Sequence, residues 1–235
     1  MGCTENRQKN LEEMAVVIAE KGLGFGCNNC ITVDSVLRKY SSNNKINHAH
    51  LGRIASKLNL RITSVHAHTK IDFFYRSLLD SEGLYNLQDL LTVGILLSKG
   101  SPVEKSRLFY QVLDIDSENS LQVNTIQSLL LRKIANHSIK SFPRLVTSEQ
   151  SSFSNIAKNE KYMNDLESVV FNGIRQVMEY FKDFCSIDEE NFVRIFGSIF
   201  DGKLTSPSGW REFLMEVLRN QNLNKSIPNR FDAEI

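Results

Sequence analysis

The first three residues, Met1, Gly2 and Cys3, carry two groups that can be joined to fatty acids. Removal of the initiator methionine exposes the amine of Gly2, and an N-terminal glycine amine is the acceptor for myristoylation. The neighbouring thiol of Cys3 can form a thioester with palmitate once the first lipid has brought the chain to a membrane. The usual signal has Ser or Thr at the sixth position, whereas this chain has Asn6. We therefore expect lipidation at Gly2 and, at a membrane, at Cys3.

The second lipid determines how firmly the chain would be held. One myristoyl chain binds a membrane reversibly, with an association constant on the order of 10⁴ per molar, so stable anchoring needs a second signal. The nearby charges are mixed in sign, because Arg7 and Lys9 are accompanied by Glu12 and Glu13. Palmitate, rather than a polybasic patch, is therefore the expected second signal. The Met-Gly-Cys opening resembles that of the dually acylated G-protein α subunits; the alternative is an ordinary frayed terminus.

A second set of chemically capable residues lies between positions 114 and 125. Oxygen-bearing side chains alternate along this segment and could surround a hard cation such as calcium in a 12-residue loop. The candidate ligands are Asp114, Asp116, Glu118, Ser120 and Thr125. Position six of such a loop is normally glycine and here is Asn119, which tolerates the required left-handed backbone. Position twelve should be a bidentate glutamate, and Thr125 offers one neutral oxygen, so we expect weak calcium binding or none.

The bulk composition is that of an ordinary globular protein. The chain has 235 residues, of which 41% are hydrophobic and 23% charged, with a formal net charge of +1. This charge gives no electrostatic reason to expect a nucleic acid as partner. The sequence contains no run of about 18 apolar residues that would predict a membrane span, and no hydrophobic signal peptide. We therefore expect a protein on the cytoplasmic side of a membrane.

Apolar residues recur mostly at helical spacing, which predicts an all-α protein. Leu11, Met14, Ala15 and Ile18 form one such stripe, and a longer one runs from Leu166 to Phe181. Ser101 to Glu104 reads as a capping box with proline in the first turn. Caps are also predicted at Asn86 and Ser186.

A helix–loop–helix unit recurs along the chain, with one apolar residue in each loop. In the Asp114 loop this residue is Leu121, and in weaker copies it is Ile46, Tyr85 and Ile187. In chain order, Tyr85 follows Ile46 by 39 residues and Leu121 follows Tyr85 by 36. Ile187 follows Leu121 by 66 residues. A last candidate loop runs from Asp201 to Glu212 and is either a distorted copy or a plain helix connection.

On the Asp114 loop and Gly2, the chain resembles the EF-hand superfamily, in particular the calcineurin-B and neuronal-calcium-sensor group. The resemblance implies paired EF-hand-like helix-loop-helix units in two lobes, with a lipidated glycine. It also implies an apolar groove that takes an amphipathic helix of a target protein, and that calcium opens in sensors. Because position twelve is Thr125, we expect a groove with little dependence on calcium.

The expected organisation has five segments. They are an acylated N-terminal segment and helix (1–30), an EF-hand-like lobe (31–139), a Ser- and Asn-rich linker (140–161), a second, degenerate lobe (162–220) and a tail (221–235). Trp210, with Phe213 and Leu214, is expected in the core rather than at a partner site.

Catalysis is not expected, because no nucleophile lies in a recognisable setting. Cys27 and Cys30 have the spacing of half a zinc site, but two cysteines in a glycine-rich connector is the favoured interpretation. The expected function is a membrane-anchored, non-catalytic regulator or adaptor that binds a target protein helix. Two alternatives stay open: a calcium sensor with one weak site at Asp114–Thr125, and a structural subunit of a larger, for example cytoskeletal, assembly.

Overall fold

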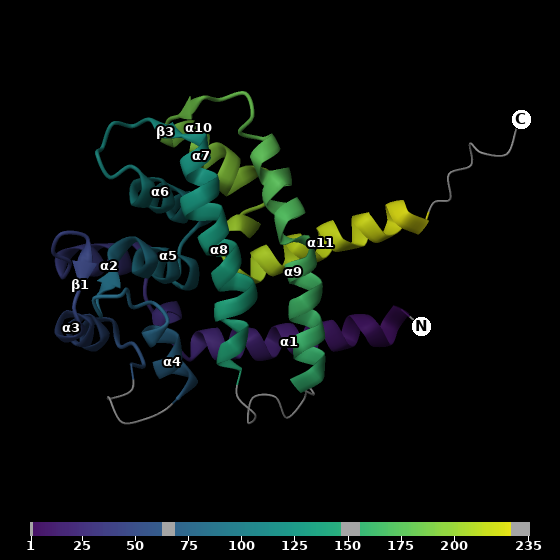
Figure 1. Cartoon of the computed structure of the whole chain (residues 1–235), viewed down its shortest axis with the longest axis horizontal. Helices are drawn as coiled ribbons and strands as arrows, with labels where there is room; N and C mark the ends of the chain where they lie inside the picture. The colour runs from purple at the N-terminus through teal and green to yellow at the C-terminus, as the bar shows by residue number, and fades with distance from the viewer. Residues whose placement is uncertain (1, 63–68, 147–155, 227–235) are drawn as a thin grey trace, which may run out of the picture.

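The computed structural model describes residues 2–62, 69–146 and 156–226, and the side chains of residues 11–62, 69–146 and 160–223. Helices dominate this part of the chain, and each strand within it is two residues long. The expected all-α class is therefore confirmed. Figure 1 shows two groups of helices beside each other, with the two long terminal helices reaching out on the same side.

The first half of the chain forms two helix–loop–helix units that meet through their loops. Its elements are η1 (Phe25–Cys27), α2 (Cys30–Lys39), β1 (Lys45–Ile46), α3 (His48–Leu58), α4 (Lys70–Arg76), β2 (Tyr85–Asn86) and α5 (Leu87–Leu97). Strands β1 and β2 are antiparallel and pair Ile46 with Tyr85. Both of these side chains are buried, so the loop pairing is continuous with the core.

The second half repeats this arrangement. Its elements are α6 (Pro102–Leu113), β3 (Leu121–Gln122), α7 (Val123–Thr125), η2 (Ile126–Leu131), α8 (Arg132–Asn136), η3 (His137–Ser141), η4 (Pro143–Leu145), α9 (Ile156–Glu179), β4 (Ser186–Ile187), α10 (Glu189–Val193) and η5 (Arg194–Ile199). Strands β3 and β4 are antiparallel and pair Leu121 with Ile187. The four apolar loop residues that the sequence spacing picks out are therefore the ones that pair, first with second and third with fourth.

The first three loops share a backbone feature. Two positions before the paired apolar residue, φ is positive, at 59° for Asn44, 73° for Gly83 and 53° for Asn119. Glycine and asparagine reach this left-handed region at the lowest cost. Asn119, at position six of the Asp114 loop, thus adopts the left-handed backbone conformation for which glycine is expected there.

Side-chain caps fix where the helices leave the loops. Asn47, Asn86 and Asp188 each directly follow a paired apolar residue, and each accepts the backbone N–H three residues on. Such caps satisfy N–H groups that have no partner within the helix. At the start of α6, Ser101 and Glu104 form the predicted capping box. The cap predicted at Ser186 is wrong, because that residue lies in β4.

Helix α5 lies at the centre of the molecule. It packs against α2, α6 and α8, so most of its faces are covered. This explains why its sequence is apolar almost throughout rather than amphipathic. Between α6 and the α10–η5 helix the core is aromatic, with Phe192 stacked on Phe196 at 5.2 Å and Phe109 edge-on to Phe196 at 5.7 Å.

After η6 (Lys203–Thr205), the last helix, α11 (Pro207–Ser226), packs along α9 and against η3. The close approach depends on Gly173 of α9, because a Cβ there would lie 2.5 Å from Leu214 Cδ2. Trp210 is fully buried, as expected, and its Nε1 donates to the carbonyl of Leu204 at 2.8 Å. The segment from Asp201 to Glu212 is therefore a helix connection followed by the start of α11, and not a loop with a paired strand.

The first helix, α1 (Gly2–Lys21), lies against α9 and η4, which belong to the second half of the chain. The segment expected as a linker, 140–161, includes the end of η3, all of η4 and the first residues of α9, while 147–155 lie outside the described residues. The N-terminal helix is thus placed by elements from the second half of the chain.

Candidate functional site

The loop from Asp114 to Thr125 is organised around its first carboxylate. Asp114 Oδ1 accepts the N–H of Glu118 and Oδ2 accepts the N–H of Asn119, both at 3.1 Å. The Asn119 side chain accepts the N–H of Glu189 at 3.2 Å, which links this loop to its partner. The loop therefore holds its turn through main-chain N–H groups that point at one aspartate.

The remaining candidate ligands are spread along this turn. Asp116, Glu118 and Ser120 are exposed, and Thr125 is half-buried in the first turn of the following helix. Within the described residues, no three His, Cys, Asp or Glu side chains form a group that could hold a metal ion. Calcium needs six to eight oxygen ligands at about 2.3–2.6 Å. The weak calcium site at Asp114–Thr125 stays a prediction.

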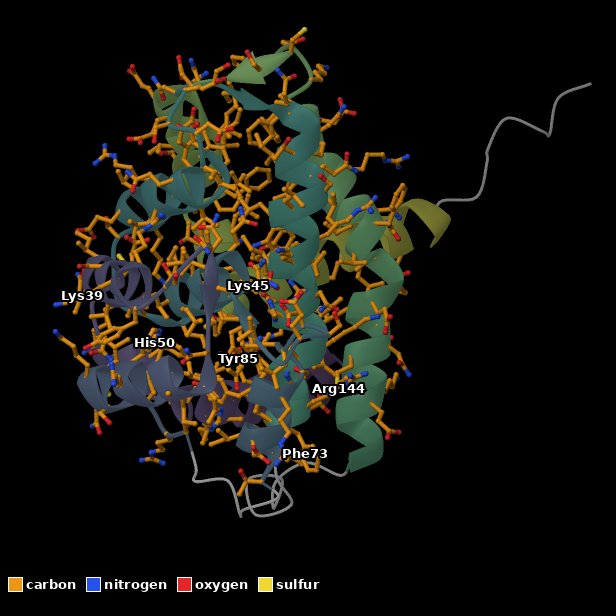
Figure 2. The ribbon with its side chains drawn as sticks, turned by 60° about the vertical axis from the view of Figure 1, so that its left-hand side comes forward. Lys39, Lys45, His50, Phe73, Tyr85 and Arg144 are labelled. Atoms are coloured by element: carbon orange, nitrogen blue, oxygen red, sulfur yellow. The ribbon has the colours of Figure 1, made fainter. Side chains whose placement is uncertain are left out.

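In the first pair of loops an ammonium group lies between two carboxylates. Lys45 Nζ is 3.1 Å from Asp80 Oδ2 and 2.5 Å from Glu82 Oε2. Lys45 donates hydrogen bonds to Glu82 and Asp80, and these bonds raise its pKa. The N–H of Leu84, which donates to Asp80, and the nearby lysine lower the pKa of Asp80. Figure 2 shows Lys45 beside the strand that carries Tyr85. One lysine thus bridges these two loop carboxylates and offsets one of their two negative charges.

The two predicted lipidation residues lie at the start of α1. The helix begins at Gly2 and includes Cys3, whose side chain is outside the described set. Figure 1 shows this end of α1 projecting beyond the packed helices, near the side on which α11 also ends. Groups attached there would extend away from the core.

The outward face of α1 is apolar where a solvated helix face would be polar. Leu11, Met14 and Ile18 have exposed fractions of 37%, 57% and 49%. They occur at i, i+3 and i+7, so they lie along one face of the helix. Of the stripe that the sequence predicts, only Ala15 is buried, and it packs against the protein together with Val16 and Ala19. An exposed apolar row beside a candidate acylation site suits contact with a lipid surface.

The inner face of α1 is fixed by a buried charge cluster that the sequence does not predict. Arg211 of α11 is 0% exposed and forms two 2.8 Å hydrogen bonds with the carboxylate of Glu13. Its Nη1 also donates to Glu20 at 2.7 Å and to the carbonyl of Ser138 at 2.9 Å. The hydroxyl of Tyr162 donates to Glu13 at 2.8 Å. One guanidinium therefore joins α1, η3 and α11, and Glu13 extends the cluster to α9. Arg211, Glu13, Glu20, Ser138 and Tyr162 are called the Arg211 clamp below.

Within the Arg211 clamp, burial and charge pairing have opposite effects on the pKa values of Glu20 and Arg211. Burial raises the pKa of Glu20, and the neighbouring Arg211 acts against this rise. Burial alone would lower the pKa of Arg211, but the hydrogen bonds and charges of Glu13 and Glu20 raise it overall. Arginine suits this place because its planar fork can satisfy a carboxylate bidentately and still donate elsewhere.

A cleft beside Phe73 lies between α4 and η4. It has a volume of about 300 Å³ and is lined by Lys70, Phe73, Phe74, Ser77, Ser141, Arg144 and Leu145. Phe73 is 57% exposed, although its neighbour Phe74 is buried. Figure 2 shows Phe73 and Arg144 near each other at this end of the molecule. The cleft thus combines an accessible aromatic ring with two cationic side chains.

The Cys27–Cys30 pair is split between surface and core. Cys27 is exposed, Cys30 is buried, and both are free thiols. Burial raises the pKa of Cys30, so its thiol is less acidic than usual. Of the four histidines nearest in sequence, His48 and His50 lie in the first turn of α3, and His66 and His68 fall outside the described residues.

No protein-family model, curated protein or solved structure matches the chain. Among the described residues, no helix combines the length and apolar character needed to span a membrane. A function for the chain is therefore inferred from its own sequence and geometry.

Proposed function

We propose that this protein is a membrane-anchored, non-catalytic adaptor built from paired, degenerate EF-hand-like units. The pairing of Ile46 with Tyr85 and of Leu121 with Ile187 supports this relationship, since each paired residue lies in a loop between two helices. The left-handed asparagines and glycine two positions earlier support it as well. The loops would then serve to join helices rather than to bind calcium.

The apolar outward face of α1 is the main support for the proposal that the protein is anchored to a membrane. Leu11, Met14 and Ile18 are exposed on the helix that bears Gly2 and Cys3. Myristate on Gly2 alone binds reversibly, and palmitate on Cys3 would make the attachment stable. The apolar face would add contact area at the headgroup level. The expected location is the cytoplasmic face of a membrane.

The partner is expected to be a protein helix that docks in the cleft beside Phe73. The face of α9 that contacts α11 is already covered by Trp210, Phe213 and Leu214, so it offers no free groove. The Phe73 cleft has an exposed ring, with Lys70 and Arg144 at its edge. This combination favours an amphipathic helix with an apolar anchor and acidic flanks.

Replacing Gly2 by alanine is expected to move the protein from membranes to the soluble fraction, because alanine removes the acceptor amine. Cys3→Ser is expected to shift most of the protein to the soluble fraction while myristate labelling persists, since one acyl chain binds weakly. The measurement is fractionation of cells that express the chain with a C-terminal fluorescent tag, together with metabolic labelling by an alkyne-bearing myristate.

A triple change of Leu11, Met14 and Ile18 to serine is the companion variant. It leaves Gly2 and the Arg211 clamp in place and is expected to reduce the membrane fraction without reducing myristate labelling. If wild type, Gly2→Ala and Cys3→Ser distribute alike, the membrane proposal is wrong. The protein would then be treated as a structural subunit of a larger assembly.

Phe73→Ser is expected to weaken binding of the target helix by about tenfold or more, because central aromatic anchors dominate such interfaces. Phe171→Ser is the matched control, since Phe171 is 66% exposed on α9 and outside the cleft. Proximity labelling in cells identifies proteins lost with the first variant only, and titration of the purified candidate gives the affinities. Equal labelling by wild type and both variants would place the partner elsewhere.

A further inference from the structure

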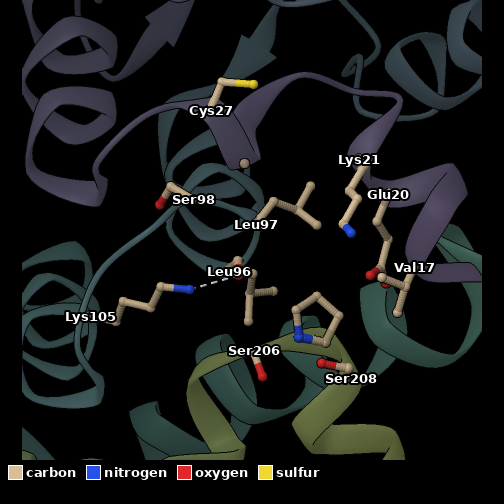
Figure 3. Close-up of a pocket in the computed structure, with 12 residues that line it drawn as sticks. Val17, Glu20, Lys21, Cys27, Leu96, Leu97, Ser98, Lys105, Ser206 and Ser208 are labelled. Carbon is tan, nitrogen blue, oxygen red and sulfur yellow. Dashed lines mark hydrogen bonds between the residues drawn. The ribbon is translucent and has the colours of Figure 1, made fainter. Parts of the chain in front are cut away.

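A second cavity lies where α1, the end of α5, the start of α6 and the start of α11 meet. Its volume is about 400 Å³, within the range of about 300–1,000 Å³ found for small-molecule sites. Val17, Leu96, Leu97 and Pro207 give it apolar walls. Figure 3 shows the lining side chains arriving from separate helices around a common space.

The unusual member of this lining is Lys105. It has an exposed fraction of 6%, and its Nζ donates to the carbonyls of Leu96 at 3.0 Å and Thr205 at 3.3 Å. An ammonium group has three N–H donors, so these two bonds leave one donor over. Within the described residues, Lys105 forms no ion pair with a carboxylate. Burial lowers its pKa to about 8, which leaves it mostly protonated at neutral pH.

Among the described residues, no carboxylate that lines the cavity forms an ion pair with Lys105. Glu20 lines the cavity, but its carboxylate is bound by Arg211 at 2.7 Å. Lys21 adds a second positive charge at the edge. Ser206 directly precedes α11, where its hydroxyl accepts the N–H of Gly209, and Ser208 lies in the first turn, where the helix dipole favours negative charge. The cavity therefore has apolar walls and, at its polar side, a buried ammonium that is bonded only to carbonyl groups.

We propose that this cavity binds a small amphipathic carboxylate, such as a medium-chain fatty acid, with the carboxylate on Lys105 and the alkyl chain against Val17, Leu96 and Leu97. A carboxylate would accept the remaining N–H of the ammonium and supply the missing counter-charge. The alkyl chain would cover apolar surface that the helices leave open. The cavity is on a different part of the molecule from the Phe73 cleft, and this site does not depend on lipidation of Gly2.

Octanoate, octanamide and octylamine are the probes, titrated into the full unlipidated chain by calorimetry. Octanoate is expected to bind at least about tenfold more tightly than octanamide, because a charge-assisted hydrogen bond replaces a neutral one. Octylamine is expected not to bind. Equal affinity for octanoate and octanamide, or no octanoate binding up to millimolar concentration, would overturn the proposal.

Lys105→Met tests the assigned contact. It is expected to reduce octanoate affinity by about tenfold or more and to leave octanamide within about twofold of wild type. The control Lys21→Met, at the edge of the same cavity, is expected to change octanoate affinity by only about twofold. Val17→Trp keeps Lys105 and fills the cavity from α1, so it should abolish binding even if Lys105→Met does not fold. Octanoate binding that survives Val17→Trp would place the ligand at another site.

Discussion

Replacing Arg211 by alanine is expected to lower the free energy of unfolding by about 3–5 kcal/mol, because removal of one partner leaves buried charges without compensation. Glu13 and Glu20 would lose their guanidinium, and the carbonyl of Ser138 its donor. Helix α1 is expected to detach from α9 and α11 before the rest unfolds. Urea denaturation measures the loss, and amide hydrogen exchange shows whether it is concentrated in α1.

The control for this change is Arg219→Ala, which removes an exposed arginine from the same helix. It is expected to alter stability by no more than about 0.5 kcal/mol. A triple variant with Arg211, Glu13 and Glu20 all changed to methionine is expected to regain most of the lost stability, since apolar replacement of a whole buried charge set is often neutral or better. Equal effects of Arg211→Ala and Arg219→Ala would show that the Arg211 clamp does not hold α1.

Thr125→Glu is expected to create calcium binding with a dissociation constant of about 10⁻⁵ M, where the unchanged chain binds at about 10⁻³ M or not at all. A glutamate at this position supplies two oxygens and a charge. Asp114, the left-handed turn at Asn119 and the pairing of Leu121 are already in place. Isothermal titration calorimetry with calcium distinguishes the two chains.

Two companion variants show whether the new affinity arises in this loop. Thr125→Gln has a similar size without the charge and is expected to gain little. Thr125→Glu combined with Asp114→Asn is expected to lose the gain. If the unchanged chain already binds calcium at micromolar concentration and Asp114→Ala removes this binding, the alternative of a working calcium sensor is correct and the proposal of a calcium-independent adaptor is wrong.

The loop pairing could be predicted from the sequence because its signals are local. One apolar residue per loop, with a glycine or asparagine two positions before it, recurs at nearly constant spacing around Ile46, Tyr85 and Leu121. A capping asparagine directly follows the first two of them. The helix cap that the sequence predicts at Ser186 lies two positions before the observed cap at Asp188. Serine and aspartate both cap helices, and the strand pairing that decides between Ser186 and Asp188 is a tertiary contact.

The Arg211 clamp and the cavity at Lys105 could not be predicted in this way. Glu13 and Arg211 are 198 residues apart, and nothing in the flanking sequence marks this arginine as buried. The exposure of the apolar stripe on α1 could not be predicted either, because helical spacing shows that the residues share a face and not what covers that face. Only the packing of α9 and η4 on the opposite side reveals that Leu11, Met14 and Ile18 stay exposed.

The sequence separation within the Arg211 clamp also sets an order of events during synthesis. Ribosomes add about 5–20 residues per second, so Arg211 is made roughly 10–40 s after Glu13. Throughout this interval the inner face of α1 lacks the guanidinium that pairs with Glu13 and Glu20. Enzymes acting on the nascent chain would meet Gly2 on a free segment, and the anchor would be attached before the body is complete. The orientation of the protein on a membrane would thus be set last, when α11 closes over α1.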